Sequence, residues 1–93
     1  MTVDDTLYQL GDAIGWDRCD YARDTDDNIY GVTDGATTLG LTPHGECVYW
    51  QTSCRIDGET ELLDDGACPM GDTQTLLGAW QRATSLFGDG EAA

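Results

Sequence analysis

The sequence predicts an α+β fold: a two-layer sandwich with an N-terminal helix, a three- to four-stranded antiparallel meander and a C-terminal helix. Two observations predict it. Apolar residues recur at helical spacing near both ends of the chain, and X-Gly turn signals follow one another at short intervals between them. The chain has 93 residues, which allows one small domain, placed at residues 1–88 with a frayed tail at 89–93.

The first predicted helix has one apolar face, formed by Val3, Leu7, Leu10 and Ile14. Thr2 and Asp5 have the spacing of a capping pair at its start. Gly15 is a natural stop. Gly11 lies inside the pattern and weakens it, because glycine is a poor helix former. After this helix, residues 16–27 are interpreted as a polar connector.

The meander is predicted from four turn signals: Asp34-Gly35, His44-Gly45, Asp57-Gly58 and Asp65-Gly66. If each of the first three is a two-residue hairpin loop, Tyr30 faces Leu39. In the next hairpin, Leu41 faces Val48 and Leu39 faces Trp50. Both registers place the same apolar set on one face, and a one-residue slip would move that set to the other face. The set is Tyr30, Val32, Leu39, Leu41, Val48 and Trp50.

The second helix is predicted near the C-terminus, where apolar spacing returns at Leu76, Trp80, Ala83 and Phe87. Asp72 is the expected N-cap, and Gly88 is the expected end. Both helices should cover the Trp50 face of the sheet. The predicted core then joins the sheet residues to Leu7, Leu10, Leu76 and Trp80.

The net charge of the chain limits the classes of function that it can have. The formal net charge is −14, from 18 acidic residues against 4 basic ones, all of them arginine. Such an acidic, lysine-free composition is typical of proteins from salt-loving archaea, in which carboxylates hold water and cations while salt screens their repulsion. It also suits a mimic of nucleic-acid charge. Direct nucleic-acid binding is excluded, because no basic patch exists to neutralise phosphates.

No apolar run approaches the ~20 residues of a membrane span, and the N-terminus does not resemble a signal peptide. We therefore expect a cytoplasmic protein with mostly reduced thiols and no membrane partner. No Gly-rich phosphate loop and no convincing catalytic set is present, so neither an enzyme nor a cofactor is expected. The segment 24–28 begins like a calcium loop, but Ile29 and Gly35 occupy the positions that need Gly and Glu.

The cysteines leave alternatives open. Cys47 and Cys54 lie about 23 Å apart on one predicted strand, which excludes a bond between them. The Asp57-Gly58 register places Cys47 opposite Cys68, where a disulfide or a thiol pair would fit. A zinc site would need His44, Cys47, Cys68 and Cys19, which lack the spacing of short-ligand clusters. Separate reduced thiols, with Cys54 as a core residue, are the favoured interpretation.

These patterns favour a non-enzymatic protein-binding module: an adaptor, a regulator or a virus-encoded inhibitor that mimics nucleic-acid charge. A small metal-binding or redox protein is the alternative. The expected partner is another protein, such as a basic nucleic-acid-binding protein, or a second copy of the chain. The contact surface is placed on the sheet face away from the helices, which carries few charges. Its residues are Thr38, Tyr49, Gln51, Ser53 and Arg55, with Thr33 and Cys47 beside them.

Overall fold

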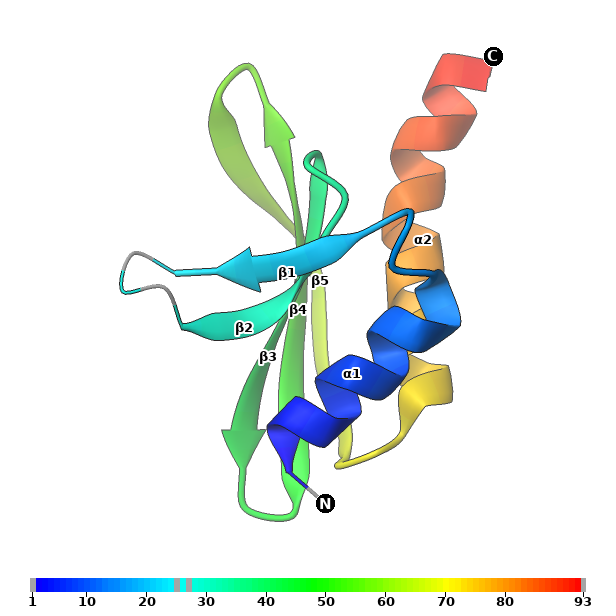
Figure 1. Cartoon of the computed structure of the whole chain (residues 1–93). Helices are drawn as coiled ribbons and strands as arrows, with labels where there is room; N and C mark the ends of the chain where they lie inside the picture. Colours follow the sequence, from blue (N-terminus) through cyan, green and yellow to red (C-terminus); the bar gives the residue numbers. More distant parts are fainter. Residues whose placement is uncertain (1, 25, 27, 93) are drawn as a thin grey trace.

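The two predicted helices pack on one face of a sheet that has more strands than expected (Figure 1). The computed structural model describes the backbone of residues 2–24, 26 and 28–92, with side chains to residue 85. The elements are α1 (Val3–Ile14), β1 (Asp20–Arg23), β2 (Ile29–Thr33), β3 (Thr37–His44), β4 (Cys47–Ile56), β5 (Glu59–Pro69) and α2 (Thr73–Ala92). Within the described residues, the strands form one five-stranded antiparallel sheet in the order β1-β2-β3-β4-β5. The α+β fold is therefore confirmed.

Helix α1 is capped as the sequence predicts. The Thr2 hydroxyl accepts a hydrogen bond from the Asp5 N–H at 3.2 Å, and the Asp5 carboxylate accepts one from the Thr2 N–H at 3.1 Å. The bond from the Thr2 N–H, with a smaller contribution from the Thr2 hydroxyl, lowers the pKa of Asp5, because it favours the charged carboxylate. Gly15 ends the helix with a φ of 108°, a value that glycine adopts without strain.

Gly11 has a packing role that offsets its weak helix propensity. The indole ring of Trp16 folds back onto the helix, and a Cβ at position 11 would overlap that ring. The Trp16 Nε1–H donates to the Asp12 carboxylate at 2.8 Å, which fixes the ring in this position. Glycine at position 11 therefore makes room for a half-buried tryptophan.

The connector prediction for residues 16–27 is wrong in part, because this segment contains β1. Tyr21 pairs with Val32, and Ala22 pairs with Gly31. The Tyr21 ring lies 4.7 Å from the Trp16 ring, so an aromatic contact attaches the strand to the end of α1. The abundance of Asp and Arg around these residues conceals the strand in the sequence.

The β2–β3 and β3–β4 hairpins keep the predicted faces but not the predicted partners. Val32 faces Leu39, and Leu41 faces Trp50. Each partner is displaced by two positions from the prediction, and a shift of two leaves every side chain on its original face.

The cause of this displacement is the position of glycine in each loop. The central loop residues are Gly35-Ala36 and Gly45-Glu46, so glycine comes first rather than second. Gly35 has a φ of 98° and Gly45 a φ of 64°, as a loop with a left-handed first residue requires. The Asp34 carboxylate also accepts hydrogen bonds from the N–H groups of Ala36 and Thr37, at 3.0 and 2.7 Å.

The β4–β5 hairpin has the predicted loop. Asp57 and Gly58 both have positive φ, at 53° and 83°, and Ile56 faces Glu59 beside them. Farther from the loop the register shifts by one, because Ser53 pairs with Leu62 whereas Thr52 pairs with Asp64. Residue 63 is therefore the extra residue of a β-bulge.

The core explains this bulge. If the pairing register set by the Asp57-Gly58 loop continued along both strands, Asp65 would lie opposite Trp50 on the buried face. An unpaired carboxylate is very costly there. The bulge instead places Gly66 opposite Trp50. A Cβ at Gly66 would lie 2.7 Å from the Trp50 ring, so glycine is required there.

The bulge also contradicts the predicted cysteine pair. Cys47 pairs with Pro69, and Cys68 pairs with Val48. Cys68 therefore lies on the buried face, while Cys47 is exposed on the other face.

The core lies between the helices and one sheet face, as predicted, with one exception. Its buried members include Leu7, Leu10, Val32, Leu39, Leu41, Val48, Trp50, Leu76 and Trp80. Tyr30 is the exception, because it is 39 % exposed. Arg23 pairs with Ile29 rather than with Tyr30, so an irregularity in the β1–β2 ladder displaces Tyr30 from the buried side.

Helix α2 starts where the sequence predicts and continues beyond the predicted end. The Asp72 carboxylate accepts hydrogen bonds from the Thr75 N–H at 3.3 Å and from the Thr75 hydroxyl at 2.7 Å. The helix runs to Ala92, so Gly88 does not end it; one helical glycine costs only about 1 kcal/mol. The side chain of Phe87 lies outside the described residues. No helix in the described part of the chain is long and apolar enough to cross a bilayer.

Candidate contact surfaces

The sheet face opposite the helices, called the outer face below, is formed by aligned cross-strand rows. One row crosses every strand, with Asp20, Thr33, Thr38, Ser53 and Leu62 as successive partners. The neighbouring rows contain Gly40, Gln51 and Asp65, then Thr42, Tyr49 and Ala67. The structure therefore brings together the residues that the sequence predicts for partner contact: Thr38, Tyr49, Gln51, Ser53 and Arg55.

Tyr30 adds an aromatic ring to the outer face that the sequence prediction assigned to the core. Its ring lies over Gly40, where a Cβ would come within 3.2 Å of the Tyr30 Cδ2. A hollow of about 370 Å³ beside this ring is lined by residues including Thr38, Ser53 and Arg55. No sequence signal marks Tyr30 as exposed, because the displacement arises from the ladder irregularity.

Leu62 is the second residue of the outer face that the sequence prediction missed. It is 60 % exposed and lies opposite Ser53. Strand alternation about the Asp57-Gly58 loop could have placed it on this face, since Arg55 and Ser53 occupy the same side.

Carboxylates lie at the edges of the outer face rather than at its centre. Asp20 is on β1 and Asp65 on β5, the two edge strands. The Tyr49 hydroxyl donates a hydrogen bond to the Asp65 carboxylate. This bond holds the phenol in its protonated form and raises the pKa of Tyr49. The face therefore has a carboxylate at each edge and a neutral centre, whereas the sequence predicted few charges on it.

The four cysteines are free and lie in different environments. Cys54 is 3 % exposed, which confirms its assignment to the core. Burial, with a smaller contribution from Asp20, raises the pKa of Cys19, whose Sγ–H donates to the Gly15 carbonyl at 3.4 Å. Burial likewise raises the pKa of Cys68. Both buried groups are therefore held as neutral thiols, which are weaker nucleophiles and metal ligands than thiolates.

The four residues considered for zinc are not assembled into a site. His44 and Cys47 face each other at the exposed end of the β3–β4 hairpin. Cys68 lies on the opposite face of the sheet, and Cys19 lies in the connection from α1 to β1. Across the described residues, no group of three or more His, Cys, Asp or Glu side chains is arranged to hold a metal ion.

In the acidic loop after β1, the first carboxylate forms hydrogen bonds within the loop itself. Asp24 accepts hydrogen bonds from the N–H groups of Asp26 and Asn28, at 2.9 and 3.0 Å. This is the local turn geometry that Asp commonly forms. Thr25 and Asp27 lie outside the described residues, so the comparison with a calcium loop extends only to their neighbours.

Comparisons with known proteins give no relative from which a function could be carried over. No family model matches the chain, and no curated protein or solved structure shows significant similarity. The outer face is consequently the candidate site, because its side chains combine exposure, aromatic character and a defined charge pattern.

Proposed function

We propose that the protein is a non-enzymatic, acidic protein-binding module that contacts its partner through the outer face. The observation that carries this proposal is a neutral, tyrosine-bearing sheet face without a covering helix, bordered by carboxylates. Asp20 and Asp65 flank the face on the edge strands, and Asp34 lies at the β2–β3 turn. The cytoplasm is the proposed compartment, and the free cysteines support it.

The centre of the face has the composition of an interface core. Interface centres are depleted in charge and enriched in Tyr and Arg, and a few large side chains supply most of the binding energy. Tyr30, Tyr49 and Arg55 are of these types. Leu62, at 60 % exposure, supplies an apolar group at one side. A partner could therefore bury aromatic and aliphatic surface here with little desolvation of charge.

The acidic edge favours a basic partner. A net charge of −14 attracts basic proteins and accelerates their association at low salt. Proteins that bind nucleic acids have such basic surfaces. The module would then compete with nucleic acid for that surface, as an inhibitor or a regulator. A second copy of the chain is the less favourable partner, since two such charges repel each other unless salt screens them.

The test is the double substitution Tyr49→Asp/Arg55→Asp, which puts carboxylates at the centre of the face. Partners are first captured from the source cells with the unmodified protein and identified, and the dissociation constant of the purified complex is then measured. We expect the double variant to weaken binding about tenfold or more. Sedimentation of the free protein measures self-association in the same samples.

A matched control is Tyr8→Asp/Arg18→Asp, which makes the same charge change on the helix side. It should leave the affinity of the purified complex nearly unchanged. If both double variants bind the partner as tightly as the unmodified protein does, the outer face is not the contact surface and the proposal is wrong.

A further inference from the structure

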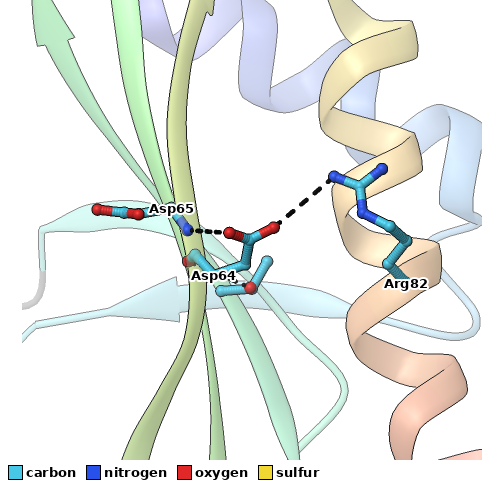
Figure 2. Close-up of polar contacts among 4 residues, drawn as sticks. Asp64, Asp65 and Arg82 are labelled. Atoms are coloured by element: carbon cyan, nitrogen blue, oxygen red, sulfur yellow. Dashed lines mark hydrogen bonds and ion pairs between the residues drawn. The ribbon is translucent and has the colours of Figure 1, made fainter.

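A second concave surface lies on the helix side of the sheet, between α2 and β5 (Figure 2). This groove has a volume of about 620 Å³, within the range of ligand-sized pockets. Thr52, Leu63, Ala79 and Ala83 contribute to its lining. In Figure 1 the far end of the β4–β5 hairpin lies well apart from the end of α2, so the two elements diverge from the groove outward.

Two local features keep the groove open. Gly78 is on the groove side of α2 and has no side chain; a Cβ there would meet only the Arg82 guanidinium, at 3.5 Å. On the opposite wall, Leu63 is the extra residue of the β5 bulge and is only half-buried. The bulge thus adds an aliphatic side chain to the groove, and the missing side chain at position 78 leaves space across from it.

An ion pair lies across the opening. The Arg82 Nη2 is 3.9 Å from the Asp64 Oδ2, and the side chains are 64 % and 57 % exposed. A pair of this length and exposure is weak. The other oxygen, Asp64 Oδ1, accepts a hydrogen bond from the Asp65 N–H at 2.9 Å, which orients the carboxylate toward α2. The Asp64 carboxylate is therefore held in place while its cation is exchangeable.

We propose that this groove is a docking site for a cationic segment of a partner protein, with one aliphatic side chain inserted beside Gly78 and a basic side chain paired with Asp64. The aliphatic anchor matches the apolar lining contributed by Ala79 and Ala83 of α2 and by Leu63 on the opposite wall. The positive charge of the segment complements both Asp64 and the net charge of −14. The groove and the outer face lie on opposite sides of the sheet, so this proposal does not rest on the proposed function.

Charge also decides against the other occupants. A second copy of the chain would bring a further net charge of −14 to an already acidic surface, which would repel it. An anionic ligand could pair with Arg82, but it would have to approach against the same field and displace Asp64. A cationic segment instead replaces Arg82 as the partner of Asp64, and it gains from the field on approach.

The test uses a short capped peptide with one leucine between two arginines, titrated into the full chain at fixed ionic strength and followed by amide NMR shifts. Gly78→Leu fills the groove and should weaken binding about tenfold or more, the effect of excluding a leucine-sized anchor. Asp64→Asn should weaken binding about threefold, as expected for an exposed pair. Arg82→Gln should tighten binding, because it removes the competing cation.

Two controls separate the groove from general charge attraction. Gln74→Leu places the same side chain at an exposed position of α2 away from the groove lining, and it should leave the affinity unchanged. A peptide with glycine in place of leucine has the same charge and should bind about tenfold more weakly. The outer-face double variant should still bind the leucine peptide, which distinguishes this result from a failure of the proposed function.

Three results would overturn the proposal. The glycine peptide could bind as tightly as the leucine peptide, Gly78→Leu could leave the affinity unchanged, or Arg82→Gln could weaken binding. The last result would mean that Arg82 helps to hold the peptide and does not compete with it for Asp64. Because Arg82 is exposed and its substitution leaves the core intact, Arg82→Gln and the glycine peptide decide the question even if Gly78→Leu fails to fold.

Discussion

Gly11 and Gly78 are both helical glycines, and the structure predicts opposite effects when each is changed to alanine. In an open helical position, Gly→Ala stabilises a protein by about 1 kcal/mol, because alanine restricts the unfolded chain and favours the helix. Gly78 is such a position, since the nearest atom to an added Cβ is the flexible end of Arg82, at 3.5 Å. Gly78→Ala should therefore raise the free energy of unfolding by about 0.5–1 kcal/mol.

Gly11→Ala should do the reverse. The added Cβ would overlap the Trp16 ring, which is held there by its bond to Asp12 and by contact with Tyr21. Inserting a methyl group into a packed contact costs about 1–3 kcal/mol, from which the helix gain of about 1 kcal/mol is subtracted. Gly11→Ala is therefore expected to lower the free energy of unfolding by up to about 2 kcal/mol.

The assay is urea unfolding followed by far-ultraviolet circular dichroism, for both alanine variants and for Gly11→Ala in a Trp16→Ala background. Removing the ring removes the clash, so in that background Gly11→Ala should stabilise by about 0.5–1 kcal/mol. The double-mutant cycle then gives a coupling energy of about 1–3 kcal/mol between positions 11 and 16. If Gly11→Ala stabilises the unmodified protein as much as Gly78→Ala does, the proposed packing role of Gly11 is wrong.

Further predictions concern the core, the charge and the thiols. Trp50→Ala should lower the free energy of unfolding by about 3–5 kcal/mol in urea titrations, because the ring is buried against Gly66; a loss below about 1 kcal/mol would contradict its burial. Thermal melts should show higher stability in molar KCl than in dilute buffer, since salt screens the carboxylates, and equal melting temperatures would argue against a repulsive surface. Cys47 should react with a thiol reagent far faster than Cys68 in the folded protein, as mass spectrometry of the labelled peptides would measure, and equal rates would contradict the β4–β5 register. The raised pKa values of Cys19 and Cys68 mean that the unfolded chain loses its thiol protons first; stability should therefore fall as the pH rises above about 8.5, and urea midpoints that stay constant to higher pH would refute this.

Periodicity in the sequence was sufficient to predict the helices, their buried faces and the buried side of the central strands. Val32, Leu39, Leu41 and Trp50 are all on the predicted face, although the loops lie one residue later than expected. The register error left the core prediction intact because a hairpin loop displaced by one residue moves each partner by two, and side chains alternate with a period of two.

The features that the sequence did not predict depend on contacts between distant segments. The β5 bulge is required by Trp50, which excludes Asp65 from the core and needs Gly66 beside it. Tyr30 leaves the core because the β1–β2 ladder is irregular, and β1 itself is concealed among charged residues. The α2–β5 groove is a consequence of the bulge and of Gly78, so its existence could not be predicted before the register of β5 was known.

The bulge at residue 63 also bears on the order in which the hairpin forms. From the Asp57-Gly58 loop to the Ser53–Leu62 pair, the register is the one that the loop itself specifies, so these pairs can form from local sequence alone. Continued in that register, pairing would bring Asp65 against Trp50, and it can proceed only after one residue is looped out. The second half of the hairpin is therefore expected to form together with the packing of Trp50 against the helices, after its first half. A mispaired state in the register of the loop would be short-lived, because it would bury the Asp65 carboxylate against Trp50 without a partner.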